Sequence, residues 1–145
     1  MENTLQPIRD AGRPWGPLDG NVAAVMTPGI ITCAPETSLA RVAEIMATHR
    51  VHALAVGGVA DDHLVWGVID ALGLVRALRT PAAHPTARSI SRRPASSIEP
   101  EAPLAEAARL MDEGGVGHLV VVDRERPVGV ISTLDVACAA AGIRT

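Results

Sequence analysis

The residues best suited to chemistry lie in the run Gly129-Val-Ile-Ser-Thr-Leu-Asp135. The apolar start and the hydroxyl residues predict a strand that passes into a helix, with Ser132 or Thr133 as the N-cap. An acid in the first turn of that helix, Asp135, can accept hydrogen bonds from the two neighbouring hydroxyls of a ribose. Hydroxyls and unpaired backbone N–H groups at a helix start suit a phosphate. The alternative is purely structural, because an acid in a first turn also stabilises a helix through the helix dipole.

A second run of the same kind lacks this acid. Residues 67–73 read Gly-Val-Ile-Asp-Ala-Leu-Gly, so Gly73 takes the place of Asp135 and Asp70 takes the place of Ser132. Glycine has no side chain to bind a ribose, and the carboxylate of Asp70 repels a phosphate. We therefore predict one site around Asp135 and a second site that is empty or much weaker.

The two runs belong to an internal repeat that covers most of the chain. Residues 35–56 align with residues 100–121 without a gap, and nine of these 22 positions are identical. The predicted organisation is an N-terminal segment, two repeats with a proline-rich linker between them, and a short tail, with bounds 1–21, 22–78, 79–87, 88–141 and 142–145.

Hydrophobic periodicity predicts the order β-α-β-β-α in each copy. Short extended runs at 30–33 and 95–98 each precede a helix with apolar residues at i, i+3, i+4 and i+7, whose first turn is expected to be acidic after a Pro-Glu pair. Two β-branched runs then predict an antiparallel hairpin before the last helix. A unit of this size cannot cover both faces of its sheet. The predicted fold is therefore α/β, of the α+β type, with the tandem copies packed as a pseudo-twofold sandwich of sheets and the helices outside.

The composition excludes several classes of function. A chain of 145 residues with 48% hydrophobic residues and a net charge of −3 predicts one soluble domain. Nucleic-acid binding is not expected, because the charge is near neutral and Tyr and Phe are absent. The apolar runs are shorter than the roughly 18 residues of a membrane helix, and the first twenty residues lack a secretory signal. We expect a cytoplasmic protein without membrane contact.

Recognisable catalytic and metal-binding motifs are missing from the sequence. Cys33 and Cys138 lie far apart and fit free thiols. His49 and His52 have no third ligand nearby, so we expect surface groups rather than metal ligands. The motifs of serine hydrolases, P-loop proteins and zinc peptidases do not occur. We expect neither an enzyme nor a metal site.

The repeated pattern resembles the cystathionine-β-synthase (CBS) domain pair. The resemblance rests on Met-Thr-Pro at 26–28, Pro-x-x-x-Leu at 35–39 and 100–104, the valine and leucine spacing into the next strand, and Gly-Val-Ile-Ser-x-x-Asp at 129–135. It implies a pseudo-twofold sandwich that commonly dimerises into a flat disc. It also implies clefts between the sheets that bind adenine nucleotides or related ligands, in a sensor without catalysis.

The resemblance also implies a set of binding residues. The strand from Thr27 to Ile31 would contact the base, Val51 and Val130 would form apolar walls, Gly117 would leave room for the ligand, and His118 would contact phosphate. Because His118 is partly charged at pH 7, phosphate affinity is expected to rise as the pH falls toward 6; a solvated or helix-facing His118 is the alternative. The candidate residues are Thr27, Ile30, Ile31, Val51, Gly117, His118, Val130, Ser132, Thr133 and Asp135. The second cleft would use His52, Val68, Arg92 and Ile98.

These observations predict a stand-alone regulatory module that binds AMP, ADP or ATP around Asp135 and acts as a homodimeric sensor of an unknown regulated protein. No cofactor is required. The alternatives are a dimerisation or docking scaffold without a nucleotide, and a binder of S-adenosylmethionine or NAD. Trp15 and Leu18 in the N-terminal segment could clamp a partner subunit or belong to a loose tail. The alanine-rich helix at 133–141 suits a twofold helix contact.

Overall fold

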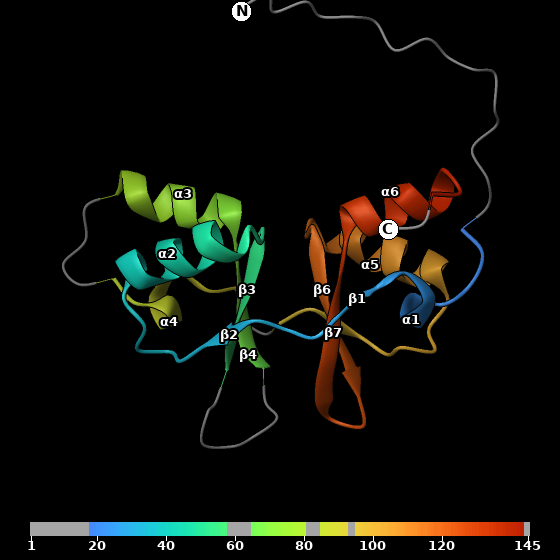
Figure 1. Cartoon of the computed structure of the whole chain (residues 1–145), viewed down its shortest axis with the longest axis horizontal. Helices are drawn as coiled ribbons and strands as arrows, with labels where there is room; N and C mark the ends of the chain where they lie inside the picture. The colour runs from blue at the N-terminus through green and yellow to red at the C-terminus, as the bar shows by residue number, and fades with distance from the viewer. Residues whose placement is uncertain (1–17, 58–64, 81–84, 93–94, 144–145) are drawn as a thin grey trace, which may run out of the picture.

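A computed structural model describes residues 18–57, 65–80, 85–92 and 95–143. Trp15 and most of the N-terminal segment lie outside the described residues. Two small sheets face each other in the middle of the molecule, and the helices lie on the outer sides of the sheets (Figure 1). The α+β sandwich predicted from the repeat is thus confirmed.

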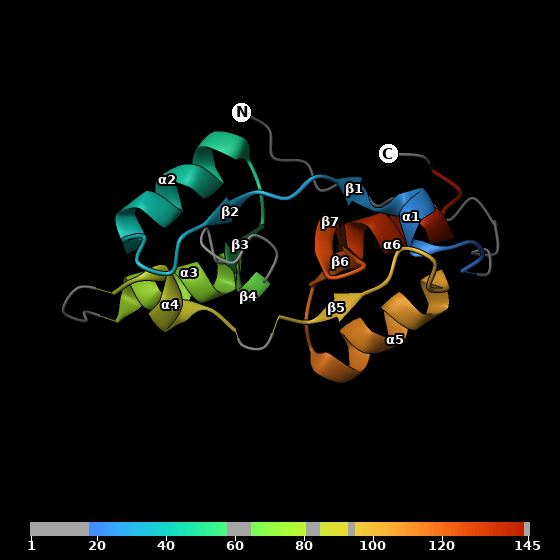
Figure 2. The same ribbon diagram turned by 90° about the horizontal axis from the view of Figure 1, so that it is seen from below.

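The first half contains a three-stranded sheet of order β2-β3-β4, in which β2 runs parallel and β4 antiparallel to β3. Helices cover its outer side (Figure 2). Its elements are β2 (Thr32–Cys33), α2 (Leu39–His49), β3 (Ala53–Gly57), β4 (Val65–Asp70), α3 (Ala71–Arg79) and α4 (Ala87–Ile90).

The second half repeats this plan with a four-stranded sheet of order β1-β7-β6-β5. Strand β5 runs parallel to β6, whereas β6 and β7 form an antiparallel hairpin, as the sequence predicts. Its elements are α1 (Val22–Val25), β1 (Thr27–Pro28), β5 (Ser97–Ile98), α5 (Leu104–Gly114), β6 (His118–Asp123), β7 (Arg126–Ser132) and α6 (Thr133–Ala140).

The two copies exchange their opening segments. Strand β1 pairs with β7 of the second copy, with Thr27 opposite Val130, and Val22 of α1 is fully buried in the core of the second half. In return, Ala87 of α4 is fully buried in the core of the first half, and Arg92 pairs with Val68. The exchange brings the strand that enters each copy against the last strand of the other copy.

Short polar side chains set the helix starts. The Ser132 hydroxyl accepts a hydrogen bond from the Asp135 N–H (3.2 Å), so Ser132 is the N-cap that the sequence predicts for α6; Asp70, which accepts one from the Gly73 N–H (2.6 Å), is the N-cap of α3. The prediction of an acidic first turn is wrong for α2. Its N-cap is Ser38, so Glu36 precedes the helix.

Each half has its own apolar core, formed by the periodic residues of its long helix and the inward faces of its strands. Full burial of a leucine or isoleucine stabilises a fold by roughly 1.5–3 kcal/mol, and five such residues of the described part of the chain are at most 1% exposed: Leu54, Ile69, Leu104, Leu119 and Ile131. No helix among the described residues has the length and apolar character required to cross a bilayer.

Candidate ligand-binding clefts

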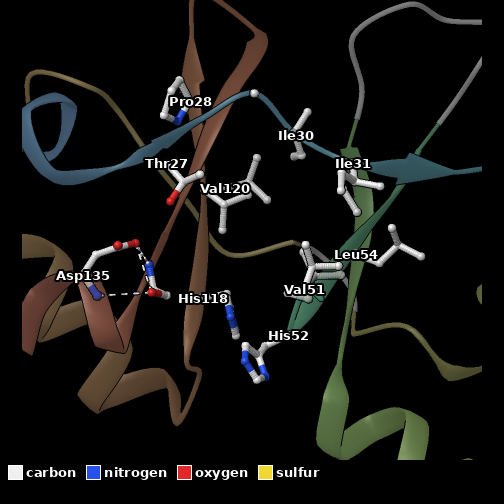
Figure 3. A pocket seen from close by; sticks show the side chains of 16 residues that line it. Thr27, Pro28, Ile30, Ile31, Val51, His52, Leu54, His118, Val120 and Asp135 are labelled. Carbon is white, nitrogen blue, oxygen red and sulfur yellow. Dashed lines mark hydrogen bonds between the residues drawn. The ribbon is translucent and has the colours of Figure 1, made fainter. Parts of the chain in front are cut away.

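A cavity of about 380 Å³, here cleft 1, opens between the two sheets. This volume lies within the range of small-molecule pockets. Figure 3 shows Asp135 on one side of the cleft and Ile31, Val51 and Leu54 on the other. Its walls come from both copies: Thr27, Pro28, Gly29, Ile30, Ile31, Val51, His52, Ala53, Leu54, Ala55, Val68, His118, Val120, Val130, Ser132 and Asp135.

Asp135 is the buried charged side chain of the described part of the chain, at 8% exposure. Its Oδ2 atom accepts hydrogen bonds from the Ser132 N–H (2.8 Å) and from the Ser132 hydroxyl (3.0 Å), which completes a capping box with the Asp135 N–H. Within the described residues Oδ1 makes no hydrogen bond. The carboxylate therefore holds the helix start with one oxygen and keeps the other available at the cleft.

The donors at the start of α6 already have partners in the protein. The Ser132 N–H is bound by Asp135, the Asp135 N–H by Ser132, and the Thr133 N–H donates to the Gly117 carbonyl (3.0 Å). The phosphate-binding role expected for Ser132 and Thr133 needs donors that are free. The capping box uses the Ser132 hydroxyl and the N–H groups of Ser132 and Asp135, and the Thr133 N–H is used by the contact with Gly117.

His118 lies half-buried at the start of β6 and lines cleft 1 beside His52 (Figure 3). Burial lowers the pKa of His118 below its ordinary value of 6.5; His52 also lowers it, whereas the carboxylates of Asp70 and Asp135 raise it. His118 is consequently neutral at pH 7. The pH range in which it could attract a phosphate lies lower than the sequence suggests.

The structure brings together all the predicted site residues except Gly117 and Thr133. Thr133, the first residue of α6, is exposed and lines neither cavity. Gly117 lines a second cavity, here cleft 2. His52, expected in that second cleft, lines cleft 1, and Ile98 is buried in the core of the second half.

These differences follow from the repeat itself. Val51, His52 and Ala53 lead into β3 and line cleft 1, whereas the aligned residues 116–118 lead into β6 and line cleft 2. At the residues just before β3 and β6, an amino acid and its repeat equivalent therefore line opposite clefts: Val51 and His52 line cleft 1, and Val116 and Gly117 line cleft 2. The structure thereby exchanges the predicted places of Gly117 and His52.

Other lining residues were missed although strand alternation could have found some of them. Val120 lies two residues after His118 on β6, and Ala55 lies two residues after Ala53 on β3, so each pair shares one face of its strand. Pro28 and Gly29 were not missed, because they lie within the segment from Thr27 to Ile31 that the resemblance assigns to the base. Leu54 carries no such signal, because it also belongs to the core of the first half.

Cleft 2 has the same volume, about 380 Å³, and a different chemistry. Arg92 donates from Nη1 to the Gly115 carbonyl (3.4 Å), and Asp70 is held as the N-cap of α3. His118 lines this cleft as well as cleft 1. The cleft is lined by Val68, Asp70, Arg92, Ala95, Ser96, Gly114, Val116, Gly117 and His118. The described residues contain no cluster of three or more His, Cys, Asp or Glu side chains suited to a metal ion.

Comparison with solved structures identifies the same architecture elsewhere. The CBS domain pair of protein MJ0100, in complex with 5′-methylthioadenosine and S-adenosyl-L-methionine, matches with a TM-score of 0.78 and 21% identity over 86% of this chain and 98% of that chain. An uncharacterized conserved protein from Pyrococcus horikoshii matches with a TM-score of 0.76 and 21% identity over 86% and 95% of the two chains.

A hexameric CBS-CP12 protein from bloom-forming cyanobacteria matches with a TM-score of 0.74 and 18% identity over 83% of this chain and 68% of that chain. No curated protein shows significant sequence similarity to this chain. The family model for the CBS domain matches twice, at residues 22–80 and 87–142. The two matched repeats, arranged around a cleft that both copies line, show that this chain belongs to the CBS domain family.

Proposed function

We propose that this chain is a regulatory module that binds an adenosine-containing ligand in cleft 1 and acts as a homodimeric sensor. One observation carries the proposal: the carboxylate of Asp135 is fixed by the capping box through Oδ2 and keeps Oδ1 as an acceptor at the edge of a largely apolar cavity. A ribose hydroxyl can donate to that oxygen, and the base then lies between the apolar side chains that face it across the cleft.

The proposal draws support from the family. The MJ0100 pair was solved with two adenosyl compounds, 5′-methylthioadenosine and S-adenosyl-L-methionine. Its low identity to this chain supports a common fold, so the class of ligand is carried over as a proposal. The sequence favours AMP, ADP or ATP within that class, with S-adenosylmethionine and NAD as alternatives.

A homodimer is supported by an apolar face on the outer helices. Helices α3 and α6 lie on the same side of the molecule (Figure 1). Both expose large apolar side chains that a monomer would leave in water. A twofold contact between two copies would bury them. The exposed residues, each 51–67% accessible, are Leu72, Val75, Leu78, Leu134 and Ile143.

The same apolar face favours a second candidate function, a dimerisation or docking scaffold without a bound ligand. In both cases the output passes through another protein or through the shape of the dimer, and no catalytic step is proposed. The two functions differ in one measurable property, namely whether cleft 1 takes a ligand.

Calorimetric titration tests the proposal with adenosine, AMP, ADP, ATP, NAD and S-adenosylmethionine. We expect binding heat with at least one of them and loss of that heat in Asp135→Ala. Absence of binding heat with all six compounds contradicts the sensor function and favours the scaffold function. Sedimentation velocity tests the dimer: we expect a dimer for the natural chain and a monomer for Leu134→Glu. A monomeric natural chain contradicts both the homodimeric sensor and the dimerisation scaffold.

A further inference from the structure

The charged groups of cleft 1 point to the kind of adenosine compound that it accepts. Asp135 is the acidic residue that lines the cavity, and no arginine is found among the described residues around it. The chain contains no lysine. The remaining ionisable groups are the imidazoles of His52 and His118, and burial lowers the pKa of His118. The cavity consequently offers a negative charge without a fixed positive one.

The two copies of the repeat differ in charge at one aligned position of the clefts. Residue 27 aligns with residue 92, because the ungapped repeat places residue 35 opposite residue 100. Thr27 lies opposite Val130 at the edge of cleft 1, and Arg92 lies opposite Val68 at the edge of cleft 2. The arginine therefore serves cleft 2, and cleft 1 carries an uncharged hydroxyl at the equivalent place.

The Ser132 hydroxyl and three N–H groups at the start of α6 already have partners, so they do not replace a missing cation. A phosphate at this helix end would compete with Oδ2 of Asp135 for the Ser132 N–H and hydroxyl. The Thr133 N–H is bound to the Gly117 carbonyl. An anion bound here would break the capping box and would lie close to the negative carboxylate of Asp135, and both changes cost free energy.

We propose that cleft 1 selects an uncharged or positively charged nucleoside and discriminates against nucleoside phosphates. This inference rests on the proposed function; within the class of adenosine-containing ligands it replaces the preference for AMP, ADP or ATP that the sequence suggests. Oδ1 of Asp135 accepts from a ribose hydroxyl in either kind of nucleoside, and its charge attracts an ammonium or sulfonium carried by the same ligand. One phosphate about 5 Å from Asp135 is expected to weaken binding about 10- to 100-fold relative to adenosine.

The test is a calorimetric comparison of adenosine, S-adenosylmethionine, AMP and ATP at pH 8 and low salt, where histidine charge contributes little. We expect adenosine and S-adenosylmethionine to bind at least about tenfold more tightly than AMP, and ATP to bind more weakly than AMP. Added salt is expected to reduce the difference between adenosine and AMP, because it screens the carboxylate.

Asp135→Asn supplies a variant with the same shape and no charge. Its amide oxygen can still accept from the Ser132 N–H, so we expect the helix start to persist and the ratio of AMP to adenosine dissociation constants to fall toward one. Asp123→Asn is the matched control, because Asp123 is exposed and lines neither cavity. We expect its ratio to equal that of the natural chain.

The outcomes separate the two proposals. AMP or ATP binding as tightly as adenosine overturns the charge selection and leaves the adenosine-binding function standing. Absence of binding by all four compounds overturns both. Should Asp135→Asn fail to fold, the ratio measured on the natural chain decides the question without it.

Discussion

Cleft 1 and cleft 2 have the same volume and different polarity, because cleft 1 is largely apolar and cleft 2 is lined by a more even mixture of polar and apolar surface. The bulky apolar pair Ile30 and Ile31 lines cleft 1, whereas the aligned residues of cleft 2 are Ala95 and Ser96. The paired strands set the volume of both cavities, and the two copies of the repeat have the same strand pairing. A few side chains on the entering strands and at the helix starts set the polarity and charge of each cleft, and these side chains differ between the two copies.

The two clefts also share a wall. His118 lines both, and its pKa responds to Asp70 at cleft 2 and to Asp135 at cleft 1. A ligand that changes the charge of this imidazole in one cleft thereby changes the field in the other. Because His118 belongs to both clefts, the two clefts are best compared with substitutions of residues that line only one of them.

The largest expected effect comes from removing the two cap carboxylates in turn. Asp70→Ala loses the N-cap acceptor of α3, and Asp135→Ala loses the capping-box carboxylate that accepts from the Ser132 N–H and hydroxyl; each loss costs about 1 kcal/mol of stability. Asp135→Ala additionally loses the acceptor of cleft 1, so we expect ligand affinity to fall about 10- to 100-fold. Urea unfolding and calorimetric titration measure the two effects. Equal losses of affinity in both variants would contradict the assignment of the ligand to cleft 1.

The next effect concerns the strand contact that closes cleft 1. An added Cβ at Gly129 would lie 2.5 Å from the Thr27 carbonyl oxygen, which cannot move without displacing β1. We expect Gly129→Ala to lower the free energy of unfolding by about 1–3 kcal/mol and to weaken ligand binding. Gly114→Ala, in cleft 2, is the control. Its nearest atom would lie 3.6 Å away, so stability is expected to stay the same or rise by up to about 1 kcal/mol.

A smaller effect is expected from the imidazole between the clefts. Because burial holds the pKa of His118 below 6.5, the unfolded chain binds this proton more readily than the folded chain. The contribution of His118 to stability is therefore complete above pH 6.5 and is lost as the pH falls below it toward the folded-state pKa. Urea unfolding between pH 5 and pH 8 is expected to show a shallower decline for His118→Gln than for the natural chain. The exposed His49→Gln serves as control, and a decline equal to that of the natural chain in His118→Gln would contradict the burial argument.

The smallest effect is expected from the arginine of cleft 2. Arg92 is exposed and makes one long hydrogen bond to the Gly115 carbonyl. We expect Arg92→Ala to change stability by at most about 0.5 kcal/mol. Adenosine affinity is expected to stay the same within the error of calorimetry, because the arginine serves the other cleft. A large loss of adenosine affinity would show that the ligand reaches cleft 2.

The sequence by itself determined the repeat, the β-α-β-β-α order, the starts of the last helices near Asp70 and Ser132, and Ser132 as an N-cap. Each of these depends on residues close together in the chain: the i, i+3, i+4 spacing of α2 and α5, the alternation of β3 and β6, and the short reach of Ser132 and Asp70 to the first turn of the next helix. The sequence also selected Asp135, because the second copy provides an internal comparison.

Tertiary structure alone decided where the two copies meet. Val22 and Ala87 lie in the core of the opposite half, and the same exchange places the aligned entering residues Ile31 and Ser96 in opposite clefts. Pairing between segments that lie far apart in the chain fixes both results, and local spacing carries no record of it. The double use of the Asp135 carboxylate, in the capping box and at the cleft, became visible only when the strand, the helix and the cavity were placed together.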